Sequence, residues 1–280
     1  MTGTELYDYT TFRSSRLITQ AYSTSFSLGI SMLARRFHDA IYGIYGFVRY
    51  ADEIVDTFHA HEKAVLLSEF RSETLKAIER GISLNPVLHS FQAVVNRYHI
   101  EHELIEAFLE SMAMDLDRST YCDRTYSQYI YGSAEVVGLM CLRVFCEGNE
   151  AQYQALRAPA QRLGAAFQKV NFLRDLQSDY VERGRTYFPD VDFRRFDAAC
   201  KAAIETDIQA DFDAAREGIL KLPKGARLGV YVAYIYYRKL FAKIKRLPHT
   251  RMLSERVRVP NRQKLALLAT TYVRHQVNAL

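Results

Sequence analysis

Acidic side chains recur at helical spacing in two separate parts of the sequence. Asp52 and Asp56 stand four residues apart, and Asn171, Asp175 and Asp179 follow one another at the same interval. Residues four apart lie on one face of an α-helix, so each run stacks its oxygen atoms in a row. Carboxylates about 6 Å apart at an effective dielectric near 20 repel by roughly 3 kcal/mol. Two such rows therefore predict a hard divalent cation, which oxygen ligands suit, and a diphosphate bound to it.

The first run extends an apolar helix face. Asp52 and Asp56 continue the stripe of Tyr45 and Val48, because steps of three and four residues keep to one face. The second run continues a stripe that passes through Gln168 in the same way. A solvated acidic row would lie opposite the apolar stripe, whereas these acids point toward the expected core.

Each acidic run has an arginine beside it. Arg49 precedes Asp52 by three residues, and Arg174 is adjacent to Asp175. Because unpaired buried carboxylates are costly, one interpretation is a pair of ordinary ion pairs. In the alternative interpretation, the arginines act with metal ions and grip a phosphate, which a guanidinium binds bidentately. The sequence leaves both interpretations open.

Composition is typical of a globular protein with an apolar interior. The chain has 280 residues, 49% of them hydrophobic and 25% charged, which is ample for a core. Its four cysteines lack metal-ligand spacing, and its first residues lack the apolar stretch of a signal peptide. No run approaches the roughly 18–20 apolar residues of a membrane span. We therefore expect a cytoplasmic protein with reduced thiols.

Helical periodicity dominates the chain, with apolar residues at steps of three, four and seven. Prolines fall mostly between the periodic segments, but Pro159 lies inside one and leaves open whether that helix is split. No alternating strand pattern, repeat or low-complexity linker is visible, so we predict one all-α domain over residues 1–280. The expected helices cover residues 41–55, 66–78, 104–116, 126–145, 151–180, 228–244 and 262–277.

Positive charge gathers toward the end of the chain. Residues 238–264 contain ten Lys or Arg against one acid, Glu255. Such a stretch is typical of contact with anionic lipid, nucleic acid or a polyphosphate ligand, and a solvated basic face is the simplest alternative. No nucleic-acid-binding motif accompanies it, so we expect no nucleic-acid partner.

Several motifs occur in the order found in the squalene/phytoene synthase family, the head-to-head prenyl transferases. They resemble its early Ser/Phe segment, its first aspartate-rich helix, its Tyr…Val-Ala-Gly-x-Val-Gly helix, its second aspartate-rich signature with the following loop, and its C-terminal aromatic and basic elements. One departure is Glu135, where the family usually has glycine, which either narrows the hydrophobic tunnel or points outward. The matching segments are residues 23–27, 49–56, 131–138, 168–179, 183–189, Tyr236 and 255–259.

The resemblance implies an isoprenoid-synthase-type helical bundle around a central cavity, with Mg²⁺ (or Mn²⁺) as cofactor. Phe26, Tyr131, Tyr187 and Tyr236 are implied as aromatic lining, with plain core packing as the alternative for each. The implied metal ligands are Asp52, Asp56, Asn171, Asp175 and Asp179. The residues implied in catalysis are Asp52, Asp56, Asp175, Asp179, Tyr131 and Tyr236. Substrate contacts are implied for Ser25, Phe26, Arg49, Gln168, Arg174, Arg185, Tyr187 and Arg256.

The second signature and its loop are most similar to those of bacterial phytoene synthases. This implies that two geranylgeranyl diphosphates condense to phytoene through a cyclopropyl diphosphate, without NADPH, in carotenoid biosynthesis. Squalene or dehydrosqualene synthesis from farnesyl diphosphate is the alternative. A non-catalytic assembly factor is a rival of another class, but all five implied metal ligands are present. Because substrate and product are greasy, we expect the basic stretch to contact the inner face of an anionic membrane peripherally. The oligomeric state is not set by the sequence.

Overall fold

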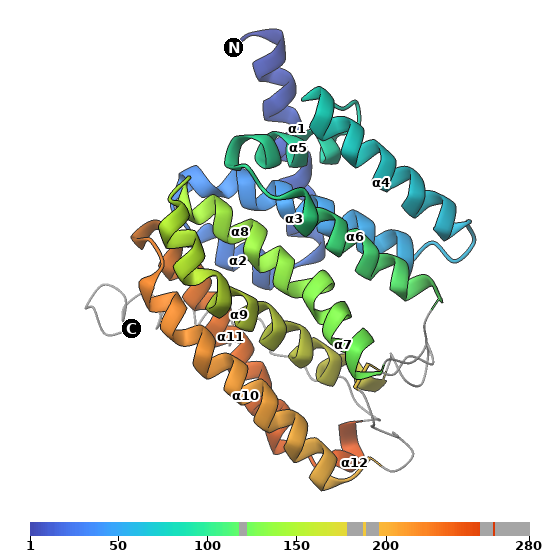
Figure 1. Cartoon of the computed structure of the whole chain (residues 1–280), viewed down its shortest axis with the longest axis vertical. Helices are drawn as coiled ribbons and strands as arrows, with labels where there is room; N and C mark the ends of the chain where they lie inside the picture. Colours follow the sequence, from blue (N-terminus) through green and yellow to red (C-terminus); the bar gives the residue numbers. More distant parts are fainter. Residues whose placement is uncertain (118–121, 178–186, 189–195, 253–259, 261–280) are drawn as a thin grey trace.

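The computed structural model describes residues 1–117, 122–177, 187–188, 196–252 and 260. Within these ranges all regular structure is helical and no strand occurs, which confirms the predicted all-α class (Figure 1). The elements are α1 (Gly3–Tyr22), α2 (Thr24–Ser31), α3 (Arg35–Asp56), α4 (Lys63–Arg80), α5 (Pro86–Tyr98), α6 (His102–Asp117), α7 (Asp123–Ile130), the π-helix η1 (Tyr131–Glu135), α8 (Val136–Cys146), α9 (Glu150–Gln177), α10 (Ala198–Lys221), α11 (Lys224–Arg246) and α12 (His249–Met252).

Local sequence signals fix where several of these helices begin and end. At the start of α1, the Thr2 side-chain oxygen accepts a hydrogen bond from the backbone N–H of Glu5. The Glu5 carboxylate in turn accepts a hydrogen bond from the backbone N–H of Thr2. Asn85 caps α5 ahead of a proline at its first turn, where no N–H is needed. Gly81 ends α4 with φ of 69°, a conformation that glycine adopts without strain.

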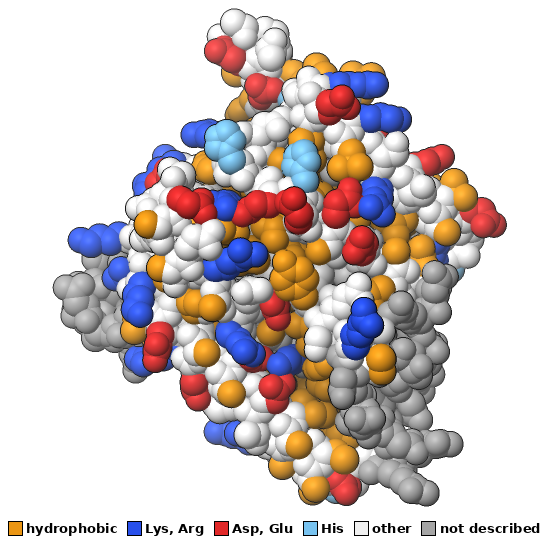
Figure 2. All heavy atoms as spheres, in the orientation of Figure 1, with side chains coloured by type: hydrophobic (Ala, Val, Ile, Leu, Met, Phe, Trp, Pro, Cys, Tyr) orange, Lys and Arg blue, Asp and Glu red, His pale blue; other side chains and the backbone are white. Residues whose placement is uncertain are grey.

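Two long helices, α3 and α9, form the frame of the bundle. Helix α3 packs against α1, α5 and α8, whereas α9 packs against α8, η1, α10 and α11. Buried apolar side chains from these helices form a continuous core, in which the rings of Phe47 and Phe91 stack at 3.8 Å between centroids. Figure 2 shows that charged side chains of both signs are spread over the outer face of the molecule, with apolar ones between them.

Pro159 does not split the helix that contains it, because α9 runs unbroken from Glu150 to Gln177. A proline inside a helix removes the bond to the carbonyl four residues earlier. That residue, Ala155, is exposed, so water can satisfy its carbonyl. The expected helix over 262–277 lies outside the described residues.

The predicted helix over 126–145 contains a π-helical turn that periodicity did not indicate. At its end the Val136 N–H bonds to the carbonyl of Tyr131, five residues back. The turn also lies very close to α6, since a Cβ at Gly132 would stand 2.4 Å from the Ala107 carbonyl oxygen. Such π-helical turns are frequent at functional sites.

One described helical stretch, Arg124–Cys146, is long and apolar enough to cross a membrane by length and composition alone. Within its most apolar window, 56% of the residues are buried in the fold. Its neighbours are α3, α6 and α9, so core packing accounts for its apolar character. A buried core helix passes the same test as a membrane span, which makes this weak evidence for a span.

Candidate active site

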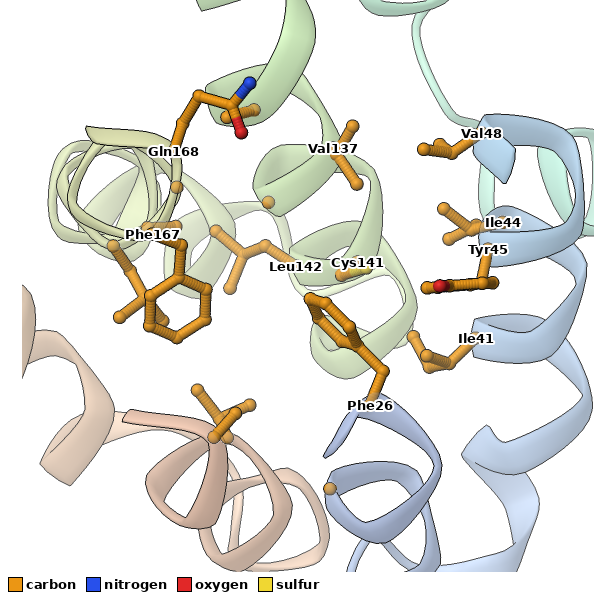
Figure 3. A pocket seen from close by; sticks show the side chains of 18 of the residues that line it. Phe26, Ile41, Ile44, Tyr45, Val48, Val137, Cys141, Leu142, Phe167 and Gln168 are labelled. Atoms are coloured by element: carbon orange, nitrogen blue, oxygen red, sulfur yellow. The ribbon is translucent and has the colours of Figure 1, made fainter. Parts of the chain in front are cut away.

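A cavity of about 400 Å³ lies between α2, α3, α6, α7, η1, α8, α9, α10 and α11. Its walls are mainly apolar, and the side chains of α3 and α8 face one another across it (Figure 3). The residues labelled there are Phe26, Ile41, Ile44, Tyr45, Val48, Val137, Cys141, Leu142, Phe167 and Gln168. A central cavity agrees with the architecture that the sequence predicted.

The polar residues of the cavity include members of both predicted acidic helices. Asp52 lines it from the last turns of α3, and Asn171 lines it from the last turns of α9. Arg49 and Gln168 line it one turn earlier on the same two helices. The structure therefore brings one member of each run to the same cavity, although the runs are more than a hundred residues apart in sequence; Asp56 and Asp175 are not among the described lining residues.

Arg49 lies within a compact charged group on α3. Its Nη1 donates to Oδ2 of Asp52 at 2.5 Å, and the guanidinium also pairs with Glu53, which is 8% exposed. The guanidinium carbon stands 4.3 Å from the centre of the Tyr22 ring, in cation–π geometry. Its buried Nε has no hydrogen-bond partner among the described residues. We call Arg49, Asp52 and Glu53 the mouth cluster.

On α9, Arg174 grips the neighbouring carboxylate of Asp175. Its Nε lies 3.0 and 3.1 Å from the two carboxylate oxygens, and Nη2 makes a further bond. Burial lowers the pKa of Arg174, but the hydrogen bonds and charge of Asp175 outweigh it and raise the pKa overall. This guanidinium therefore stays charged. The ion pairs predicted for both arginines are present, and neither excludes a phosphate ligand.

Asn171 is held in place by two neighbours. Its Nδ2 donates to Oε1 of Gln168 at 3.4 Å, and its Oδ1 accepts a bond from the Tyr237 hydroxyl at 3.3 Å. Burial raises the pKa of Tyr237 to about 12, although Arg174 opposes the rise. Tyr237 therefore remains a neutral donor over the physiological pH range.

The donor set at this end of the cavity fits a hard cation. Carboxylate and amide oxygens suit Mg²⁺, whereas zinc favours sulfur and imidazole. Among the described residues, no group of three or more His, Cys, Asp or Glu stands close enough to hold a metal. Asp179, the last acid of the second run, lies outside those residues. The metal site therefore stays a prediction.

Of the aromatic residues expected to line the cavity, only Phe26 does so among the described residues. Its ring lies 5.5 Å from that of Tyr45 and 6.5 Å from that of Tyr237, which also line the cavity. Tyr45 belonged to the stripe seen in the sequence, so helical periodicity alone was enough to indicate it. Burial raises the pKa of the Tyr45 hydroxyl, which keeps it neutral.

Tyr131, Tyr187 and Tyr236 are not among the described residues that line this cavity. Tyr187 stacks on Phe172 at 4.1 Å between ring centroids, within the core. One residue along a helix turns the side chain by about 100°, so Tyr237 faces the cavity in place of Tyr236.

The remaining predicted residues divide into two groups. Ser25 is half-buried on α2 but does not line the cavity, and Glu135 also lies outside its lining. The Glu135 carboxylate instead accepts a bond from Nε2 of Gln161 at 3.2 Å, so it points away from the tunnel and does not narrow it. Asp179, Arg185 and Arg256 lie outside the described residues.

Residues 19–263 match the model of the squalene/phytoene synthase family. The chain belongs to this family. It is 27% identical to a phytoene synthase of Arthrospira platensis, over 94% of this chain and 92% of that protein. It is 28% identical to the 15-cis-phytoene synthase of Synechocystis, over 94% and 84% of the two chains. Members of the squalene/phytoene synthase family are prenyltransferases that act on prenyl diphosphates.

Solved structures show the same fold. A dehydrosqualene synthase in complex with a ligand superposes with a TM-score of 0.83, at 22% identity, over 96% of this chain and 98% of that one. A squalene synthase from Alicyclobacillus acidocaldarius gives 0.75, at 21% identity, over 86% and 95%. These likenesses establish the squalene/phytoene synthase architecture for the described helices.

Proposed function

We propose that this protein joins two geranylgeranyl diphosphates head to head to give phytoene in carotenoid biosynthesis. The observation that carries the proposal is the placement of Asp52 and Asn171, from two acidic helices, on one mainly apolar cavity. A diphosphate needs the charged end of such a cavity, and a prenyl chain needs the apolar remainder. The phytoene synthases at 27–28% identity support the choice of substrate.

On this proposal, Mg²⁺ (or Mn²⁺) is held by the oxygen atoms of both acidic runs. When bound, the metal supplies Lewis-acid stabilisation of the departing diphosphate. The proposed ligands are Asp52, Asp56, Asn171, Asp175 and Asp179. Arg49 and Arg174 add fixed positive charge beside them, and this charge is already in place before the reaction begins.

The proposed chemistry proceeds through two ionisations. The first releases diphosphate and leaves an allylic cation, which the double bond of the second substrate attacks; loss of one proton gives a cyclopropyl diphosphate. The second releases the other diphosphate, and rearrangement with loss of a second proton gives the hydrocarbon. Phe26 and Phe167 in the wall exclude water from the cations and present aromatic faces to them.

The main alternative within the family is condensation of farnesyl diphosphate to squalene or dehydrosqualene. The two solved structures described above are a dehydrosqualene synthase and a squalene synthase, but at 21–22% identity they establish the fold alone. The alternative of another class is a non-catalytic assembly factor. We propose no role for NADPH, because loss of a proton ends the phytoene route without a hydride donor.

A direct assay separates these functions. Purified protein is incubated with Mg²⁺ and either geranylgeranyl or farnesyl diphosphate, with and without NADPH, and the hydrocarbon is identified by mass spectrometry. We expect phytoene from geranylgeranyl diphosphate in the absence of NADPH. Squalene as the sole product would assign the farnesyl substrate instead. Absence of hydrocarbon from either substrate, in detergent and in lipid, would remove the enzymatic function.

We also propose a cytoplasmic location with peripheral contact at an anionic membrane surface. Lys239, Lys245 and Arg246 are exposed on α11, at the start of the basic stretch. Each basic residue near an anionic surface contributes about 1 kcal/mol to binding. Flotation with vesicles is expected to favour anionic over neutral lipid, and equal flotation with both would contradict the proposal.

A further inference from the structure

Ser133, on the π-helical turn η1, is a polar residue in an apolar part of the cavity wall. It lines the cavity together with Phe108 and Met112 of α6 and Val137 of α8. Its hydroxyl oxygen is buried and has no hydrogen-bond partner among the described residues. Buried hydroxyls are normally bonded, so an unbonded one in a cavity wall needs an explanation.

Other buried serines of the bundle are satisfied within the protein. The Ser111 hydroxyl donates to the Phe108 carbonyl, three residues back, and the hydroxyls of Ser15 and Ser90 bond to each other at 2.7 Å. Serine in a helix usually makes such local bonds. Ser133 makes none among the described residues. The fold therefore does not require a hydroxyl at this position.

The register of η1 and α8 against α9 fixes the depth of Ser133. A Cβ at Gly164 would lie 2.7 Å from the Ala134 carbonyl oxygen, and one at Gly138 would lie 3.1 Å from that of Ala160. These antiparallel contacts set Ser133 level with residue 165, six residues before Asn171 on α9. At 1.5 Å per residue, it lies about 9 Å deeper than Asn171. If the diphosphate binds beside Asn171, as proposed, Ser133 lies at the depth of the prenyl chain.

We propose that Ser133 determines the product by turning its hydroxyl oxygen toward the positive charge on the prenyl chain. No hydrogen bond from the described residues holds the hydroxyl in its present rotamer, and the residue lines the cavity, so the proposal requires a second rotamer with the oxygen facing the cavity. In that rotamer the oxygen lone pair attracts the cation and holds it in place while the released diphosphate takes the proton. Ser133 forms no covalent bond and takes no proton. The inference rests on the proposed condensation of geranylgeranyl diphosphate.

The test compares Ser133→Val with Ser133→Thr. The two side chains have nearly the same shape, but only threonine keeps the hydroxyl. Hydrocarbons, alcohols and released cyclopropyl diphosphate are measured by mass spectrometry with geranylgeranyl diphosphate. We expect Ser133→Val to raise the ratio of by-products to phytoene about five- to tenfold, as loss of one hydrogen-bond-sized interaction predicts, with little change in KM. Ser133→Thr is expected to keep the wild-type ratio.

Two further measurements keep the test decisive. Ser133→Ala removes only the oxygen and is expected to behave as Ser133→Val does, so the comparison with wild type stands even if the threonine variant folds poorly. Equal product ratios in wild type, Ser133→Val and Ser133→Ala would overturn the inference while leaving phytoene synthesis intact. Absence of hydrocarbon from the wild type would instead overturn the proposed function, and the inference with it.

Discussion

Two charged groups of this protein contrast in how their charges are matched. The mouth cluster sets one guanidinium, that of Arg49, against the carboxylates of Asp52 and Glu53, and it borders the cavity. A second group, which we call the buried cluster, joins α9 to α10 through Lys169, Arg162, Asp207 and Asp211. The mouth cluster carries a surplus of negative charge, whereas the buried cluster has two charges of each sign.

Within the buried cluster, the contacts are made between members of the same group. Lys169 Nζ lies 2.5 Å from Asp207 and 2.7 Å from Asp211, and Arg162 lies 3.0 Å from the other oxygen of Asp211. Asp211 is 1% exposed and Lys169 is 7% exposed, and they form the buried centre; the side chains of Asp207 and Arg162 at its edge are 56% and 60% exposed. A matched group of this kind holds two helices together. A group with more acidic than basic members beside a cavity is suited to a cation and a charged ligand.

Neutralising the mouth cluster tests this contrast with the largest expected effect. Asp52→Asn keeps the side-chain shape but removes the negative charge of a proposed metal ligand. We expect turnover to fall on the order of a hundred- to thousandfold, a loss typical of removing one electrostatic group from an active site. Circular dichroism and the melting temperature should show that the fold is retained, because one source of acidic repulsion is also lost.

Asp175→Asn is expected to behave in the same way, and Asp213→Asn is the matched control. Asp213 has a largely exposed side chain on α10 and lies outside the cavity lining, so its replacement should leave turnover unchanged. Full activity of either Asp52→Asn or Asp175→Asn would refute the proposed metal role of that residue.

Substitution in the buried cluster should have the opposite pattern of effects, with a large loss of stability and little loss of activity. Lys169→Met leaves Asp211 buried without its closest cation, and breaking a buried ion pair costs about 3–5 kcal/mol. Urea denaturation should show this loss, whereas kcat/KM per folded molecule should change little. The double variant Lys169→Met/Asp211→Asn should regain much of the stability. A large loss of activity without loss of stability would place the buried cluster in the active site.

The acidic helices were predictable because their information is local. The four-residue spacing of Asp52 and Asp56 puts both on one face of any helix, and the flanking Tyr45 and Val48 show which face turns inward. The same periodicity predicted that α9 would carry Asn171. Both predictions rest on the spacing of residues within one helix, so neither required knowing which helix lies across the cavity.

Features that depend on contact between helices were not predictable. The sequence resemblance favoured Tyr236, but the packing of α11 turns Tyr237 to the cavity. The π-helical turn at Tyr131–Glu135 adjoins the close contact between Gly132 and α6, which no periodicity encodes. The buried cluster likewise joins residues some forty positions apart whose pairing depends on the register of α9 and α10.

Glu135 lies beside the buried cluster, and the pH dependence of stability tests how well Arg162 and Lys169 balance its charge. Burial raises its pKa above the ordinary 4.5; Arg162 and Lys169 oppose the rise, and Asp211 adds to it. The folded state thus favours the protonated form, so wild-type stability declines as pH rises from 4.5 through the raised pKa. Glu135→Gln does not titrate. Its melting temperature should therefore exceed that of wild type by a margin that grows as the pH rises from 4.5 through the raised pKa of Glu135. A margin that is constant or shrinks would mean that Arg162 and Lys169 fully offset the burial of this carboxylate.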